Sequence, residues 1–92
     1  VSLLGPDGST KELDTECVFI EKDLVPNSEY VKDLVELDEQ GRIVIDSINR
    51  TNVPGVFAAG DITNIYAEQV IVAMGEGAKA ALSAFDYLLR TK

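Results

Sequence analysis

The chain of 92 residues contains no histidine and a single cysteine, Cys17. Histidine is the commonest general base and metal ligand in proteins, so its absence removes the usual starting point for both kinds of site. One cysteine can form neither an internal disulfide nor a CxxC redox pair. A thiol-based redox cycle within these residues is therefore excluded, and the sequence predicts neither a metal site nor a catalytic residue.

Basic residues are also scarce, with eight Lys and Arg against sixteen Asp and Glu and a net charge of -8. An acidic chain without a basic run argues against nucleic acid and against anionic membranes as partners. No apolar run reaches the length of a membrane span. We therefore expect no nucleic-acid partner, no membrane partner and a cytoplasmic location.

Hydrophobic residues make up 46% of the chain, which is enough for one small domain or for part of a larger one. Val1 carries no start signal, and the first residues read as the middle of a β element. We expect the chain to be a piece of a longer polypeptide.

The first half of the chain is predicted to contain short β elements separated by turns, because its apolar runs are brief and bounded by Gly, Pro, Asn and Asp. The first hairpin follows from the turn signal Pro6–Ser9. The predicted elements are a hairpin of residues 1–4 and 10–15, a buried strand over Cys17–Ile20, a short helix over Ser28–Leu34 capped by Asn27 or Ser28, and a second hairpin of residues 35–38 and 42–46.

The second half of the chain, Thr51–Arg90, is the part around which the rest is expected to be organised. Val56–Ala59 is a short apolar run that predicts a buried strand, and Gly60 and Asp61 follow at its carboxyl end. In open α/β sheets that edge is where ligands bind. A long helix is predicted from Glu68 or Gln69 to Arg90, with its positive end directed toward the same region. A carboxylate for hydroxyl groups and a helix N-terminus for negative charge together predict half of a cofactor site.

The predicted helix carries one narrow stripe of polar residues among apolar and small ones. This spacing predicts that the stripe faces water and that both flanks are buried. The stripe consists of Glu76, Lys79, Ser83, Asp86 and Arg90.

Two interior glycines, Gly75 and Gly77, each cost the predicted helix about 1 kcal/mol relative to alanine. Close packing of the helix against a sheet is the favoured interpretation. Close approach of a cofactor near Gly75 is the alternative.

These motifs together resemble the C-terminal segment of thioredoxin-reductase-like flavoproteins. The resemblance lies in NVPGVFAAGD at residues 52–61, in Glu68–Val70 and in GEGA at residues 75–78. The tail GEGAKAALSAFDYLLR is similar to that of the flavoprotein subunits of alkyl hydroperoxide reductases. Upstream, Cys17–Ser28 resembles the crossover between the two domains of the family, and Gly41–Asp46 resembles a hairpin strand.

The resemblance implies an α/β fold, namely part of the FAD/NAD(P)-binding, two-dinucleotide-binding-domain fold, with short β strands and hairpins and one long C-terminal helix. It implies that residues 1–25 are the end of a nicotinamide domain with the crossover, and that residues 26–92 are the C-terminal part of an FAD-binding domain. The chain contains neither G-x-G-x-x-G nor CxxC. By itself it is therefore not expected to complete a catalytic cycle.

The resemblance also implies a cofactor-binding set of Gly60, Asp61, Gln69 and Val70. In this interpretation Asp61 hydrogen-bonds the ribityl chain of FAD, and the backbone N–H groups of Gln69 and Val70 face the flavin pyrimidine edge. A helix N-terminus there would favour the negatively charged reduced flavin. The alternative for Asp61 is an Asx-turn cap of the Thr63–Asn64 loop.

Three positions depart from the family pattern: Cys17, Lys22–Asp23 and Glu68. We expect Cys17 to be a small buried residue rather than a reactive thiol, because no basic residue flanks it. Glu68 would bring negative charge near the flavin edge. The alternative for Glu68 is an acid in the first helical turn that complements the helix dipole.

Two hypotheses about function follow. The first is the FAD-contacting C-terminal part of an NAD(P)H-dependent disulfide oxidoreductase, with FAD and NAD(P)H as cofactors of the parent protein. Its partners would be the remainder of the FAD and nicotinamide domains, a second copy in a homodimer and a redox partner protein. The alternative is a self-associating interaction fragment that binds no cofactor.

Overall fold

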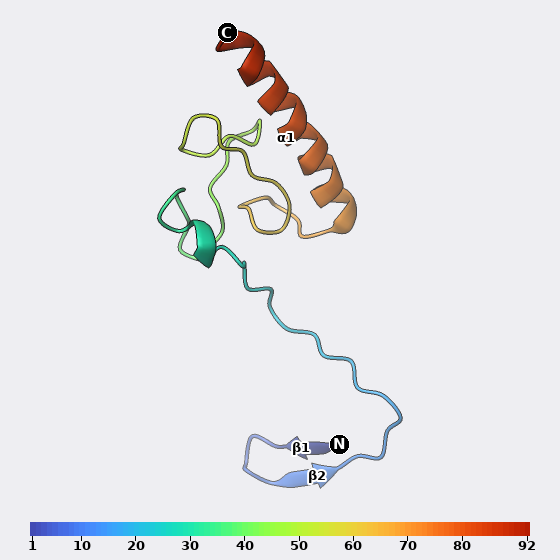
Figure 1. Cartoon of the computed structure of the whole chain (residues 1–92). Helices are drawn as coiled ribbons and strands as arrows, with labels where there is room; N and C mark the ends of the chain where they lie inside the picture. The colour runs from blue at the N-terminus through green and yellow to red at the C-terminus, as the bar shows by residue number, and fades with distance from the viewer.

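The computed structural model describes all residues, Val1–Lys92. Its elements in chain order are strand β1 (Ser2–Leu4), strand β2 (Thr10–Glu12), the 3-10 helix η1 (Glu29–Val31) and helix α1 (Val70–Arg90). The β1–β2 hairpin lies apart from a body of loops and α1, and an extended segment joins the two (Figure 1). The molecule is correspondingly elongated, with extents of 66 × 27 × 19 Å.

The first predicted hairpin is confirmed. β1 and β2 pair antiparallel, with Leu3 opposite Lys11. The turn between them is held by Asp7, whose carboxylate accepts hydrogen bonds from the Ser9 N–H at 3.0 Å and the Ser9 hydroxyl at 2.6 Å. Gly8 has a φ of 80°, a left-handed conformation that glycine adopts without strain. This hairpin needs only local contacts, which is why the sequence predicts it well.

The predicted buried strand over Cys17–Ile20 is wrong. These residues form no strand, and no backbone hydrogen bond joins residues 18–25 to another segment. Phe19 is 94% exposed, and Cys17 is exposed as well, which corrects the expectation that it is buried. A strand is stable only beside a neighbouring strand, and this chain places none there.

The predicted helix over Ser28–Leu34 is shorter than expected and is the single 3-10 turn η1. Ser28 stands at its N-cap position, but the hydroxyl donates to the carbonyl of Gly41 at 2.5 Å instead of capping the helix. The second predicted hairpin is present as a turn with one bridge, between Leu37 and Ile43, and not as two continuous strands. Tertiary contacts therefore replaced the local interactions that the sequence pattern favoured.

Two turns of the body have the same construction, an aspartate followed four residues later by an arginine. In each, one carboxylate oxygen accepts two backbone N–H bonds and the other accepts the arginine Nε, at 2.8 Å for Asp38–Arg42 and 2.7 Å for Asp46–Arg50. Hydrogen bonds from the backbone N–H of Arg42 and of Arg50 are the main reason why the pKa values of Asp38 and Asp46 lie below 3.8. Both turns are thereby tied to ionised carboxylates.

The buried core is small. Val35 and Ile43 are its hydrophobic members, and Ser28, Asn49 and Thr63 are buried polar residues. The predicted buried strand over residues 56–59 is reduced to one bridge, between Arg50 and Phe57, and its residues are only half-buried. The backbone groups of Phe57 and Ala59 make no hydrogen bond, since the chain offers no strand on that side.

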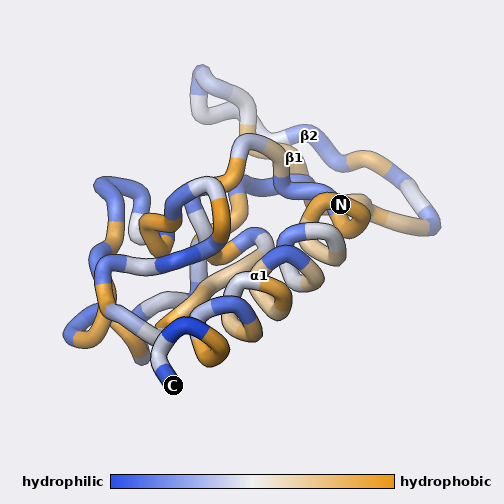
Figure 2. Tube along the Cα trace, turned by 90° about the horizontal axis from the view of Figure 1, so that it is seen from above, coloured by the Kyte–Doolittle hydropathy of each residue, from blue (hydrophilic) through white to orange (hydrophobic).

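Helix α1 agrees with the prediction in extent, because it begins at Val70, with Gln69 as N-cap, and ends at Arg90. Its orientation corrects the prediction. Members of the polar stripe, such as Glu76 and Lys79, are half-buried against the loops, while the apolar residues face outward (Figure 2). Those exposed apolar residues are Val70, Ile71, Met74, Leu82, Phe85, Leu88 and Leu89. Although this face is apolar, no helix of the chain is long and apolar enough to cross a membrane.

The two helix glycines also differ from the favoured prediction. A Cβ atom built on Gly75 or Gly77 would meet no other heavy atom within 4 Å. Close packing against a sheet is therefore wrong for the contacts within this chain, because the helix side that bears these glycines is uncovered. Approach of a cofactor near Gly75 remains a prediction.

The two aspartate turns predict low carboxyl pKa values that NMR can measure residue by residue. We expect side-chain carbon titrations to place the pKa values of Asp38 and Asp46 below 3.8. These turns therefore stabilise the fold above the unfolded pKa, and the contribution is lost as the pH falls through the folded values. Arg50→Met should raise the pKa of Asp46 yet leave it below 3.8, because the backbone bond is the larger cause.

Asp38 serves as the internal control in the same Arg50→Met sample, since its own arginine is untouched. An Asp46 pKa at or above 3.8 in the wild-type chain would contradict the observed hydrogen bonding.

Candidate functional site

The Gly60–Asp61 corner is a tight turn that is fixed to the body. Gly60 has a φ of 83°, and its carbonyl accepts both the Thr63 N–H at 3.0 Å and the Thr63 hydroxyl at 2.7 Å. Thr63 is 1% exposed. On either side of Thr63, Ile43 donates its N–H to Ile62 at 2.9 Å and accepts the N–H of Asn64 at 3.1 Å. The corner is therefore held from inside and cannot drift from the body.

The same corner lies beside the beginning of α1. A Cβ atom built on Gly60 would be 3.7 Å from the Cβ of Ala73, which belongs to the first turn of the helix. That distance is an ordinary van der Waals contact. The backbone of the corner and the first helical turn are thus neighbours, as the sequence pattern predicted.

The Asp61 side chain is exposed and makes no hydrogen bond or ion pair with the rest of the chain. The Asx-turn alternative is not observed, because Thr63 closes this turn with its own N–H and hydroxyl. A carboxylate with unused acceptor capacity at this place suits hydroxyl groups of a ligand.

The N-terminus of α1 also has unused hydrogen-bonding groups. Gln69 is extended, with φ -134° and ψ 141°, and its side chain caps nothing. The backbone N–H groups of Val70, Ile71 and Val72 have no acceptor in the chain. Such groups and the helix dipole favour negative charge or acceptor atoms at this end of a helix. Both predicted residues here, Gln69 and Val70, are exposed.

Glu68 does not occupy the position that the sequence suggested as an alternative. It precedes the N-cap, and the first turn of α1 contains no acidic residue. Its carboxylate is exposed and forms no ion pair. The charge therefore lies just outside the helix, where solvent screens it.

One buried amide joins the two sides of this region. The Nδ2 of Asn49 donates to the carbonyl of Ala58 at 2.9 Å and to Oε2 of Glu76 at 2.7 Å. The Nζ of Lys79 donates to Oε1 of Glu76 at 3.0 Å. Hydrogen bonds from Asn49, followed by those from Lys79, lower the pKa of Glu76. Glu76 is therefore held as an ionised acceptor facing the loops.

Asn49 was not among the residues that the sequence singled out. It is completely buried, and its φ of 64° is a conformation in which asparagine is one of the few tolerated residues besides glycine. Its Oδ1 is buried without a partner, which costs about 1–3 kcal/mol. Asparagine in a polar loop is too common for the sequence alone to have identified this role.

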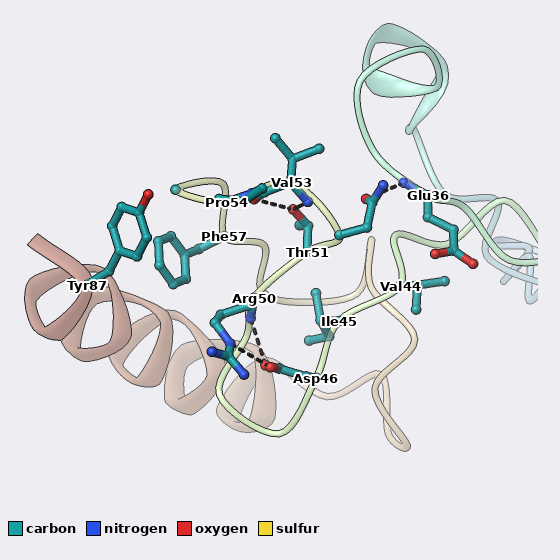
Figure 3. A pocket seen from close by; sticks show the side chains of 12 residues that line it. Glu36, Val44, Ile45, Asp46, Arg50, Thr51, Val53, Pro54, Phe57 and Tyr87 are labelled. Atoms are coloured by element: carbon teal, nitrogen blue, oxygen red, sulfur yellow. Dashed lines mark hydrogen bonds and ion pairs between the residues drawn. The ribbon is translucent and has the colours of Figure 1, made fainter. Parts of the chain in front are cut away.

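A pocket of about 450 Å³ lies between the loops and the C-terminal half of α1 (Figure 3). Phe57 and Tyr87 form one wall, with ring centroids 6.0 Å apart and an edge-to-face angle of 72°. Arg50 faces Asp46, with which it is already paired. None of the four predicted cofactor-binding residues lines this pocket, so it is a separate feature.

Comparison with known proteins gives a match for most of the chain. Residues 2–77 match the family model described as pyridine nucleotide-disulphide oxidoreductase. The chain is 53% identical over 87 residues to an alkyl hydroperoxide reductase subunit of Staphylococcus aureus (strain Mu50), covering 91% of this chain and 17% of that protein. It is 48% identical over 81 residues to the alkyl hydroperoxide reductase subunit of the same kind from Pseudomonas aeruginosa, covering 88% and 16%.

Solved structures give the same result. Thioredoxin reductase from T. acidophilum superposes with a TM-score of 0.78 at 46% identity, covering 91% of this chain and 28% of that one. The enzyme from Lactococcus lactis gives 0.77 at 38% identity, covering 92% and 28%. The predicted resemblance to thioredoxin-reductase-like proteins is confirmed, and so is the prediction of a partial fold of that kind. The chain spans less than a third of each relative.

Alanine substitutions at two glycines test the geometry of the corner. Gly60→Ala should destabilise the chain by about 1–2 kcal/mol, because a φ of 83° is unfavourable for any residue with a Cβ. Gly75→Ala should instead stabilise it by about 1 kcal/mol, since the position is helical and open. Urea unfolding followed by circular dichroism measures both changes.

The two variants control for each other, because each adds one methyl group. Equal effects of the two substitutions would contradict the left-handed turn at Gly60.

Proposed function

The chain belongs to the pyridine nucleotide-disulphide oxidoreductase family, and on that premise we propose that it is the FAD-contacting C-terminal part of an NAD(P)H-dependent disulfide oxidoreductase of the thioredoxin reductase type. Residues 1–25 would close the nicotinamide domain and lead across, and residues 26–92 would complete the FAD domain. The whole enzyme would bind FAD and NAD(P)H, act in the cytoplasm as a homodimer and reduce a disulfide on a redox partner protein.

The observation that carries this proposal is the contact between the Gly60–Asp61 corner and the first turn of α1. It brings an acceptor with free capacity close to unpaired backbone donors. The chemistry of the two groups fits FAD, whose ribityl chain presents hydroxyl groups and whose flavin ring presents carbonyl and nitrogen acceptors. Asp61 would accept hydrogen bonds from the hydroxyls, and the N–H groups of Val70, Ile71 and Val72 would donate to the ring.

When bound, FAD supplies the two-electron relay between NAD(P)H and a disulfide. The residues of this chain would bind and orient it. The positive end of α1 would favour negative charge at the adjacent ring edge without any rearrangement during the reaction. Glu68 opposes this effect, but its exposure to solvent weakens the repulsion.

The remaining parts of such an enzyme lie outside this chain. A G-x-G-x-x-G turn would hold the FAD pyrophosphate, and a CxxC pair would relay electrons to the substrate, but these residues contain neither. The chain spans 17% of its S. aureus relative, which leaves ample length for both. The chain alone is therefore proposed to be catalytically incomplete.

A second candidate function is self-association without a cofactor. The uncovered apolar face of α1 favours it, since Leu82 is 68% exposed and Phe85 is 59% exposed. The extended segment adds further uncovered residues, with Phe19 94% and Val25 88% exposed. Apolar surface of this kind normally marks an interaction site. In the first proposal the rest of the enzyme covers it; in the second, another copy does.

An Asp61→Ala substitution in the full-length enzyme tests the first proposal. We expect FAD to bind about tenfold or more weakly, because the ribityl hydroxyls lose a charged acceptor. Equilibrium dialysis of FAD against the apoenzyme measures the dissociation constant. Asp33→Ala removes an equal charge at an exposed position away from the corner and should leave the constant unchanged. Unchanged binding in Asp61→Ala would remove Asp61 from the site.

Sedimentation velocity of the purified 92-residue chain tests the second candidate. We expect a colourless protein that sediments as a dimer or a larger species. Leu82→Glu with Phe85→Glu should shift it toward the monomer, because two charges would be buried in the contact. The pair Lys11→Gln and Lys92→Gln changes the net charge by the same amount at exposed positions and should have no such effect. A yellow monomer would contradict self-association and favour a competent FAD site.

A further inference from the structure

Asn49 lies between the two halves of the proposed FAD site without belonging to either. We propose that Asn49 is a positioning residue, which sets the distance and angle between the Gly60–Asp61 corner and the N-terminus of α1 through its bonds to Ala58 and Glu76. This inference rests on the proposed function, since it assigns Asn49 to the FAD site through those contacts. Asn49 itself would not touch the cofactor.

The covalent path from Asn49 to each half is short. Ala58, which accepts one bond from Asn49 at 2.9 Å, lies two residues before Gly60. Glu76, which accepts the other bond at 2.7 Å, lies three residues after Ala73, the residue that Gly60 contacts. One NH2 group therefore spans the end of the corner segment and the beginning of the helix. Any change in this bridge would move one half of the site relative to the other.

The chemistry of the bridge also leaves little freedom. Both partners of the amide, the carbonyl of Ala58 and the ionised carboxylate of Glu76, are acceptors only. The NH2 end of Asn49 must therefore face them, and a flipped amide would place oxygen against oxygen. This orientation leaves Oδ1 buried without a partner. The amide thus serves here purely as a double donor, at the expense of its own oxygen.

Glu76 is held from its other side as well. Lys79 donates to Oε1 at 3.0 Å, so each carboxylate oxygen has one donor. The Glu76 side chain is 17% exposed and the Lys79 side chain 41% exposed. Lys79 lies on the same helix and cannot tie α1 to the loops. Only the bond from Asn49 does so at this point, which is why the inference centres on that residue.

The decisive variants remove or retain the bridge in the full-length enzyme with FAD bound. Asn49→Gly keeps the left-handed backbone and deletes the amide. Glu76→Ala deletes the acceptor, and Glu76→Gln keeps an oxygen that can accept from Asn49. Asn52→Ala is the matched control, because Asn52 also holds a loop, by accepting the Glu36 N–H at 2.8 Å, but does not reach α1.

Two measurements report on the site itself: the FAD dissociation constant of the apoenzyme, and the midpoint potential of the bound flavin. We expect Asn49→Gly and Glu76→Ala to weaken FAD binding about tenfold. Both should also lower the potential, because a displaced helix N-terminus favours the negatively charged reduced state less. Glu76→Gln should keep both quantities near the wild-type values. Asn52→Ala should change neither.

The outcomes separate the possible failures. A wild-type enzyme without flavin would overturn the proposed function together with this inference. A wild-type enzyme with flavin, whose Asn49→Gly and Glu76→Ala variants keep the wild-type dissociation constant and potential, would overturn the inference alone. Lower thermal stability with an unchanged potential would do so too, since it reports only a structural role. If Asn49→Gly does not fold, the difference between Glu76→Ala and Glu76→Gln decides.

Discussion

The body of this protein depends on one buried contact, the hydrogen bonds from the Asn49 amide to Ala58 and Glu76. The hydrophobic core contains only Val35 and Ile43 as fully buried members, too little to hold a 21-residue helix by packing. Polar contacts carry a larger share of the task than in most small domains. The Phe57–Tyr87 pair secures the far end of α1, and the amide secures the near end, where the proposed site lies.

The sequence predicted those parts of the fold that need only local interactions. The β1–β2 hairpin follows from a turn motif, and α1 follows from a helical pattern that begins and ends within about two residues of the observed bounds. The strands over residues 17–20 and 56–59 were wrong or reduced, because strand formation requires a distant neighbour that these residues do not include. The polar stripe of α1 was assigned to the wrong side for the same reason, since which face is covered depends on what packs there.

The proposed site shows the same division. Gly60, Asp61, Gln69 and Val70 were identified through a family motif, and the corner and the helix start do lie together. Asn49 has no comparable motif, because its role arises from a left-handed backbone and two acceptors brought in from residues 58 and 76. Its identification required the three-dimensional arrangement. The uncovered apolar face of α1 and the unpaired backbone of Phe57 and Ala59 belong to one pattern: this chain presents surfaces that the remaining domains of an enzyme would cover.

The most direct test of the account is a crystal structure of the full-length enzyme with FAD bound. The account predicts that the Asp61 carboxylate lies within hydrogen-bonding distance of a ribityl hydroxyl, with the N–H groups at the start of α1 directed at the flavin ring. A structure in which FAD is bound but contacts neither Asp61 nor the start of α1 would contradict it.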